Sequence, residues 1–206
     1  NFIEALGGND TINAGIGNYN TFYEVELFKR QVGVTKPDFV VLQYYINDAE
    51  PNPKAEINSI YLLKHSLFAG FAYHNIQLLI AKASGPLSNF YSQLYTDESP
   101  GWVRAQQALR ELKSLCDARN IPLVAIFIPE LQDLSVKGPY QAIYQKIFTV
   151  FNGLNIPILN SFPEIEAAYG KNPGKAKVSP DDPHPVAEIH HILGNMLYGF
   201  MKDKDF

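Results

Sequence analysis

The sequence predicts a single α/β domain in which a mainly parallel sheet lies between two layers of helices, a three-layer α/β/α fold. Two runs, over residues 38–45 and 121–128, are apolar at nearly every position, as strands buried on both faces are. Helix-like segments alternate with these runs, and such alternation favours a parallel sheet covered on both faces. The 206 residues contain no internal repeat and no linker, so we expect one domain over 1–206.

The first elements are predicted from glycine and capping residues. Residues 1–6 resemble the end of a helix, because the glycine pair that begins at Gly7 suits the left-handed position after a helix C-terminus. A short strand is predicted over residues 11–16. Thr21 is the expected N-cap of the next helix, and Glu24, three residues later, would complete a capping box.

The later elements follow from hydrophobic periodicity. Residues 58–84 are apolar but broken by polar and charged side chains, which favours one or two soluble helices over a membrane span of about 20 apolar residues. The remaining predicted elements are a helix over 101–119, the strand over 121–128, a helix over 139–155, a short strand over 156–159 and a helix over 185–201.

Two of these helices have a predicted apolar face. In the helix over 101–119 the residues expected to face the core are Val103, Leu109, Leu112 and Leu115. The last helix is expected to begin with Pro185 at its first position and to bury one stripe. The residues of that stripe are Ile189, Leu193, Met196 and Phe200.

Composition excludes several classes of protein. With 46% hydrophobic and 18% charged residues, the chain has an ordinary globular composition, unlike a disordered or coiled-coil protein. A net charge of −4 argues against a nucleic-acid partner, which would require a basic face. The single Cys116 excludes an internal disulfide framework and any multi-cysteine metal site. The chain opens at Asn1 with no initiator Met and no signal peptide, so we expect that its natural beginning is missing.

Three loops are candidates for a functional site. Ligands of open α/β sheets bind outside the carboxyl ends of the strands, and this rule selects residues 17–20, the pair Asn47 and Asp48 after the strand over 38–45, and residues 181–184 before the last helix.

The last of these loops has the residues of a catalytic base. Asp181 could accept the Nδ1 hydrogen of His184, which would fix the imidazole tautomer and leave Nε2 free to take a proton from a nucleophile. Pro183 and Pro185 would stiffen the turn. The alternative is that His184 caps the helix and Asp181 is a solvated loop acid.

The other two loops could stabilise an oxyanion. The side-chain amide of Asn47 and the backbone N–H groups of Gly17 and Asn18 could donate to an oxygen that becomes negative in the transition state. The alternatives are an Asx turn at Asn47 and Asp48 and a positive φ at Gly17.

Together and in chain order, these loops resemble the SGNH (GDSL-like) hydrolase family. The stretch over 13–21, Asn-Ala-Gly-Ile-Gly-Asn-Tyr-Asn-Thr, is similar to the second block of that family. Residues 45–48, Tyr-Ile-Asn-Asp, resemble its G-x-N-D block, and residues 181–184, Asp-Asp-Pro-His, resemble its terminal D-x-x-H block.

The resemblance implies a flavodoxin-like sheet and a serine nucleophile that forms an acyl-enzyme. It implies that His184 is the base, that Asp181 orients it and that Asn47 donates to the oxyanion. The second oxyanion donor would be the backbone N–H of Asn18, or that of Gly17 if the turn is shifted by one residue.

The chain departs from the family pattern in three ways. No Gly-Asp-Ser occurs in it, so the block with the nucleophile is expected in about 15–30 upstream residues. Tyr45 and Asn18 replace family glycines; Asn18 is tolerable there because asparagine accepts left-handed conformations. The literal G-x-N-D match over 7–10 precedes a predicted strand, so we interpret it as a helix-ending turn.

The sequence therefore predicts a serine-type esterase for an O-acyl ester, on a small molecule, carbohydrate or lipid, with no cofactor, no metal and no transmembrane segment in this chain. Without the upstream serine the 206 residues are expected to be inactive. The alternative is a non-catalytic carbohydrate- or partner-binding domain of the same fold. A flavodoxin-like nucleotide binder is less favoured, because no Gly-rich phosphate loop opens a helix. The family resemblance favours an extracytoplasmic (periplasmic or secreted) location.

Overall fold

A computed structural model of the protein describes residues 10–17, 19–51, 86–179 and 182–203. The predicted helix end over 1–6, most of the turn over 7–10 and the predicted helices over 58–84 lie outside these ranges. Asn18 and Asp181 also lie outside them, so their predicted roles stay predictions.

The described sheet has three parallel strands in the order β1-β2-β3. Their bounds are Val40–Tyr44 for β1, Leu123–Phe127 for β2 and Ile158–Asn160 for β3. In the register, Val40 is opposite Leu123, and Ala125 is opposite Ile158. The predicted α/β class with a parallel sheet is therefore confirmed.

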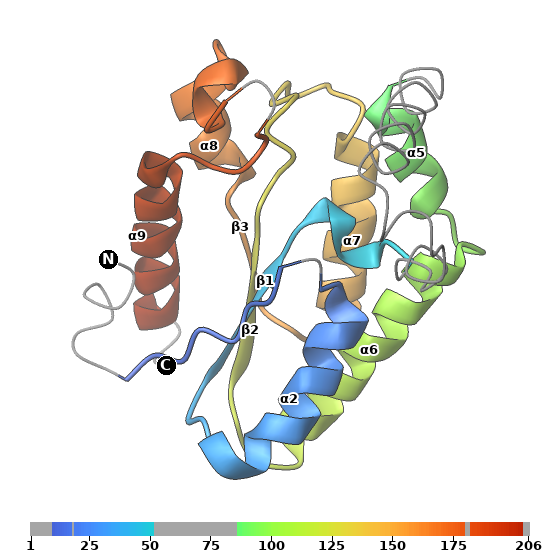
Figure 1. The fold of residues 1–206 in the computed structure, drawn as a ribbon, viewed down its shortest axis with the longest axis vertical. Coiled ribbons are helices and arrows are strands. Elements are labelled where there is room, and N and C mark those ends of the chain that lie inside the picture. The colour runs from blue at the N-terminus through green and yellow to red at the C-terminus, as the bar shows by residue number, and fades with distance from the viewer. Residues whose placement is uncertain (1–9, 18, 52–85, 180–181, 204–206) are drawn as a thin grey trace, which may run out of the picture.

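Helices lie on both sides of this sheet (Figure 1): α2, α6 and α7 on one side, and α9 on the other. The bounds of the helices are Thr21–Thr35 for α2, Leu87–Leu94 for α5, Pro100–Asp117 for α6, Gln141–Gly153 for α7, Phe162–Tyr169 for α8 and Ala187–Asp203 for α9. Two 3₁₀ helices, η1 over Ile46–Ala49 and η3 over Pro173–Ala176, lie in loops. Of these helices, α5 and α8 were not predicted.

The core is centred on β2, whose five residues are all buried. This strand has a neighbour on each side and helices over both faces, which explains its uninterrupted apolar sequence. Trp102 and Leu109 from α6 and Phe151 from α7 are among the largest side chains that pack in the same cluster.

The prediction that the strand after α2 is buried on both faces is wrong for β1. Gln43 is exposed, and Val40 and Val41 are only half-buried. The physical reason is position, because β1 is an edge strand of the described sheet and pairs with β2 alone.

The prediction of a strand over 11–16 is also wrong. This segment is not in a strand, and Ile12 and Ile16 are 63% and 46% exposed. An apolar run becomes a strand when a neighbouring strand satisfies its backbone groups, and no described strand pairs with this one.

Asn20, not Thr21, caps α2. The Asn20 side chain accepts a hydrogen bond from the backbone N–H of Tyr23 at 3.2 Å, whereas Thr21 is the first helical residue and is fully buried. Either residue type can cap a helix. Because the Thr21 side chain is buried, the side-chain oxygen of the half-buried Asn20 is the capping acceptor. Glu24 therefore does not close the predicted capping box.

The predicted core-facing stripes of two helices are confirmed in part: Leu109 and Leu112 of α6 and Ile189 and Leu193 of α9 are buried, whereas Val103, Leu115, Met196 and Phe200 are not. In α6 the buried positions are Gly101, Trp102, Ala105, Ala108, Leu109, Leu112 and Cys116, and Val103 is 37% exposed. In α9 the buried positions are Ile189, Leu193, Gly194 and Leu197. Pro185 precedes α9 and forms an isolated antiparallel bridge with Lys177. Each residue turns a helix by about 100°, so a small error in phase moves a side chain from the core to the surface.

Candidate functional site

The described parts of all three predicted site loops lie beyond the carboxyl ends of the strands. The helix η1 directly follows β1, and the segment before α9 crosses the same end of the sheet (Figure 1). Helix α2 runs opposite to β1, so its N-terminus, after Gly17, also lies there. This is the edge at which ligands bind in open α/β sheets.

Asp182 holds the imidazole of His184. Its Oδ1 lies 2.6 Å from Nδ1 of the His184 ring and also accepts the His184 backbone N–H at 3.0 Å. These hydrogen bonds, the backbone one first, lower the pKa of the Asp182 carboxyl. A carboxylate on Nδ1 favours the tautomer in which Nδ1 carries the hydrogen and Nε2 carries the free lone pair.

The His184 loop is fixed by a short antiparallel arm. The backbone N–H of Val186 donates to Ala176 O at 3.0 Å, and that of Val178 donates to His184 O at 3.0 Å. At the tip, the backbone N–H of Asp182 donates to the Ser179 hydroxyl at 3.0 Å. The backbone of His184 is therefore anchored on both sides, while its side chain remains 82% exposed.

Asp181, the predicted orienting residue, lies outside the described residues, and the carboxylate found on His184 is that of Asp182. The sequence contained a signal for it. An aspartate that accepts the backbone N–H two residues ahead forms an Asx turn, and Asp182 has that spacing to His184.

Asn47 lies in η1, where its backbone carbonyl is hydrogen-bonded and its side chain has no hydrogen-bond partner among the described residues. Its carbonyl accepts the backbone N–H of Glu50 at 2.8 Å. The side chain is exposed and makes no hydrogen bond to any residue that the structure describes. An amide at the end of a strand with both N–H groups unused has the chemistry of an oxyanion donor.

Asp48 gives η1 its shape. One carboxylate oxygen accepts the backbone N–H of Tyr45 at 2.6 Å, and the backbone N–H of Asp48 donates to the Tyr45 carbonyl at 3.0 Å. The turn at the end of the strand is thus closed by Asp48 and not by Asn47, which leaves the Asn47 amide available.

Two carboxyl groups interact electrostatically here, that of Asp48, which is buried, and that of Glu24, a half-buried residue of α2. Burial raises the pKa of Glu24 to about 7. Burial, and after it the negative charge of Glu24, also raises the pKa of Asp48. One Glu24 carboxyl oxygen and the Thr21 hydroxyl are buried with no hydrogen-bond partner in the described structure. Sequence reasoning missed the pair Glu24 and Asp48, because nothing in the neighbouring sequence shows that burial raises the pKa of either carboxyl group.

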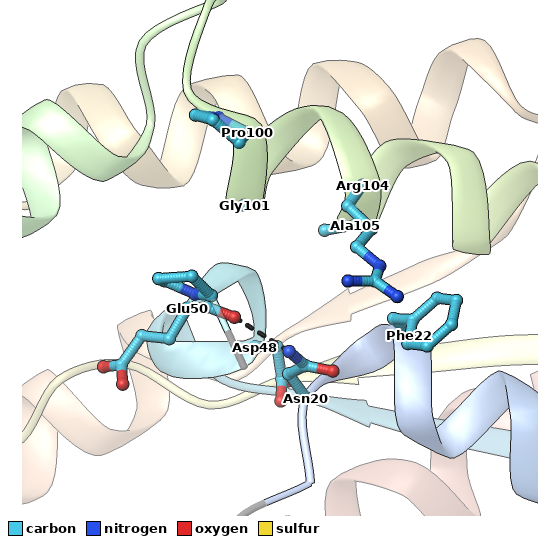
Figure 2. A pocket seen from close by; sticks show the side chains of 9 residues that line it. Asn20, Phe22, Asp48, Glu50, Pro100, Gly101, Arg104 and Ala105 are labelled. Atoms are coloured by element: carbon cyan, nitrogen blue, oxygen red, sulfur yellow. Dashed lines mark hydrogen bonds between the residues drawn. The ribbon is translucent and has the colours of Figure 1, made fainter. Parts of the chain in front are cut away.

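A small cleft of about 90 Å³ separates the start of α2 from the start of α6 (Figure 2). On one side the Asn20 amide donates to the Glu50 carbonyl at 2.8 Å; nearby, the Arg104 guanidinium lies 3.6 Å from the centre of the Phe22 ring. The first of these contacts joins the predicted second block directly to the loop that carries Asn47.

Neither the backbone conformation nor the surroundings of Gly17 require a glycine at this position. Its φ is not left-handed, and an added Cβ would meet no atom within 4 Å. The backbone N–H of Tyr19 donates to Ile16 O at 3.1 Å across this turn. The predicted alternative, a glycine that needs positive φ, is therefore wrong.

The Asn20–Glu50 contact thus joins the turn before α2 to the Asn47 loop, but no hydrogen bond or ion pair within 10–17, 19–51, 86–179 and 182–203 joins His184 to either. Within the same ranges no group of three His, Cys, Asp or Glu side chains could hold a metal ion. None of the described helices combines the length and apolar character needed to cross a membrane.

Comparison with protein-family models, with curated proteins and with solved structures finds no match for this chain.

Proposed function

We propose that this chain belongs to a serine-type ester hydrolase of the SGNH kind, with a flavodoxin-like three-layer fold. The observation that carries the proposal is the pair Asp182 and His184, in which the carboxylate binds Nδ1 at 2.6 Å and the His184 side chain is 82% exposed. Such a pair is the base and its orienting group in hydrolases that use a serine nucleophile.

In the proposed reaction the serine Oγ attacks the ester carbonyl carbon, and its proton passes to Nε2 of His184. The tetrahedral intermediate places its negative charge on the former carbonyl oxygen, which accepts hydrogen bonds from the Asn47 amide and from a backbone N–H at Asn18 or Gly17. The intermediate then expels the alcohol, which takes the proton from Nε2. Water repeats the sequence on the acyl-enzyme and releases the acid, so the reaction needs no cofactor.

The nucleophile is proposed to lie on a segment outside the 206 residues. No Gly-Asp-Ser occurs among them, and no serine in the described ranges hydrogen-bonds to the His184 ring. The outer edge of β1, with half-buried Val40 and Val41 and exposed Gln43, is where a further parallel strand could pair and bring a serine beside Asn47. The substrate would be an O-acyl ester of a small molecule, carbohydrate or lipid.

A serine-directed fluorophosphonate tests the proposal. The 206-residue chain is compared with a protein that carries its natural upstream sequence, and the same longer protein with His184→Ala is the control. We expect labelling of the longer protein only, on an upstream serine, and strong loss of labelling in the His184→Ala variant. The proposal is overturned if the longer protein neither reacts with the fluorophosphonate nor hydrolyses a p-nitrophenyl ester.

The second candidate is a carbohydrate- or partner-binding domain that keeps the fold without catalysis. Two observations favour it. No serine among the described residues hydrogen-bonds to the exposed His184 ring, and Tyr45 stands in place of the glycine of the family block. The coding sequence upstream of Asn1 separates the two, since a Gly-Asp-Ser there supports the esterase and its absence supports the binding domain.

A further inference from the structure

Tyr45 links the loops that follow two neighbouring strands. Its hydroxyl donates to Oε2 of Glu130 at 2.5 Å. Tyr45 directly follows β1, whereas Glu130 lies three residues beyond the end of β2 and is 2% exposed. The tyrosine that replaces the family glycine therefore has a definite contact across the carboxyl edge of the sheet.

Glu130 is a buried carboxylate bound by neutral donors. Its Oε1 accepts the backbone N–H of Gln132 at 3.0 Å, and its own backbone N–H donates to the Tyr144 hydroxyl at 2.9 Å. No Lys or Arg in the described part of the chain forms an ion pair with it. A buried carboxyl depends on its hydrogen bonds when no cation compensates it, so the Tyr45 hydroxyl is a main source of its stabilisation.

Tyr45 is fixed at its backbone as well as at its ring. Its N–H donates to the Asp48 carboxylate at 2.6 Å, and its carbonyl accepts the Asp48 N–H at 3.0 Å. Burial, and then the charge of Glu130, raises the pKa of the Tyr45 hydroxyl, so the hydroxyl keeps its proton and stays a donor. Asn47 lies between Tyr45 and Asp48, and its own side chain makes no hydrogen bond within the described part of the chain.

We infer that the hydrogen bond between Tyr45 and Glu130 is a positioning device for Asn47, which ties the loop after β1 to the loop after β2 and fixes where the Asn47 amide points. Tyr45 and Glu130 are positioning residues that act through the backbone of η1. The inference rests on the proposed function for the catalytic meaning of Asn47, but the ordering can be measured without any enzyme activity.

The test uses hydrogen exchange and NMR relaxation on the 206-residue chain. Tyr45→Phe removes only the hydroxyl, Glu130→Gln weakens the same bond from its other end, and Tyr140→Phe is the matched control because its hydroxyl makes no hydrogen bond that involves η1. We expect the Asp48 amide to exchange about tenfold faster in Tyr45→Phe, as the loss of one charge-assisted hydrogen bond implies, and the Asn47 side-chain amide to become more mobile. Because both changes break one bond, the double variant should add little to either single variant.

Two results would overturn the inference. One is an unchanged Asp48 exchange rate and Asn47 mobility in Tyr45→Phe relative to Tyr140→Phe. The other is faster exchange by the same factor across β2, which would show general destabilisation and not a local effect. In the longer protein the expected change is a lower kcat with an unaltered KM. Local loosening in a longer protein that has no esterase activity would leave the positioning intact and overturn the proposed function alone.

Discussion

The Oδ1 atom of Asp182 accepts two hydrogen bonds from one residue, the backbone N–H of His184 at 3.0 Å and its ring Nδ1 at 2.6 Å. Because one oxygen binds both groups, the position of the imidazole is coupled to the backbone of its own loop. Antiparallel pairing of residues 176–178 with residues 184–186 anchors that backbone, so an exposed ring gains a defined orientation without being buried.

The first prediction separates the two neighbouring aspartates. Asp182→Asn should change the His184 tautomer from Nδ1–H toward a mixture with Nε2–H, because an amide can donate to the ring as well as accept from it. Long-range ¹H–¹⁵N spectra of the ring nitrogens at pH 8 measure this. Asp181→Asn is the control and should leave the ring signals unchanged. The opposite pattern would assign the orienting role to Asp181.

The second prediction concerns Asn47. In the longer, active protein, Asn47→Ala should lower kcat by about 10²–10³, or about 3 kcal/mol, since it removes one oxyanion donor. The Tm should hardly change, because the side chain is exposed and makes no hydrogen bond to a described residue. Steady-state kinetics and calorimetry of the same preparation test both parts. A large fall in Tm would show a structural role instead.

The third prediction concerns pH. Burial raises the pKa of Glu24 to about 7, so the folded state binds more protons than the unfolded state between about pH 4.5 and 7. The free energy of unfolding should therefore fall as pH rises through this window, by up to about 3 kcal/mol at about 1.4 kcal/mol per pKa unit. Urea denaturation at a series of pH values measures the slope.

Glu24→Gln tests the assignment of that slope. The substitution removes one titrating group, but burial, the larger cause of the raised pKa of Asp48, remains after the Glu24 charge is gone, so the slope between pH 4.5 and 7 should become less steep. Asp182 acts with the opposite sign, because its lowered pKa gives stability that is present above its unfolded pKa and is lost as the pH falls through its folded value. A slope that Glu24→Gln leaves unchanged would assign the pH dependence to other groups.

The sequence predicted the elements whose pattern is decided locally. All five residues of β2 are apolar and buried, and the predicted strand over 121–128 contains the observed one. Helices α6, α7 and α9 were predicted within a few residues of their observed ends, and the start of α2 within one residue. Strand β1 was found, but its burial was overestimated, because burial depends on which strands lie beside it.

The site was predictable in its residue types and less so in its pairings. Asn20 and Thr21 are both good capping residues, and only packing shows that Thr21 faces inward. Glu130 in isolation resembles a solvated loop acid. Its contact with Tyr45 joins residues 85 positions apart, and no local pattern encodes such a contact.

The fourth prediction concerns Gly101, where α6 approaches η1. A Cβ built on Gly101 would lie 2.1 Å from the Ala49 carbonyl oxygen, closer than real contacts allow, and that oxygen belongs to backbone that cannot rotate away. Gly101→Ala should therefore destabilise the fold by about 1–3 kcal/mol, as overpacking does, and should displace η1 together with Asn47.

Gly33→Ala is the matched control for this substitution. Gly33 is an exposed residue inside α2, and an added Cβ there meets no atom within 4 Å, so the change should stabilise the protein by about 0.5–1 kcal/mol through helix propensity and chain entropy. Urea denaturation of both variants gives the two signs. If Gly101→Ala also stabilised the protein, the close approach of α6 to η1, and with it the fixed position of the Asn47 loop, would be wrong.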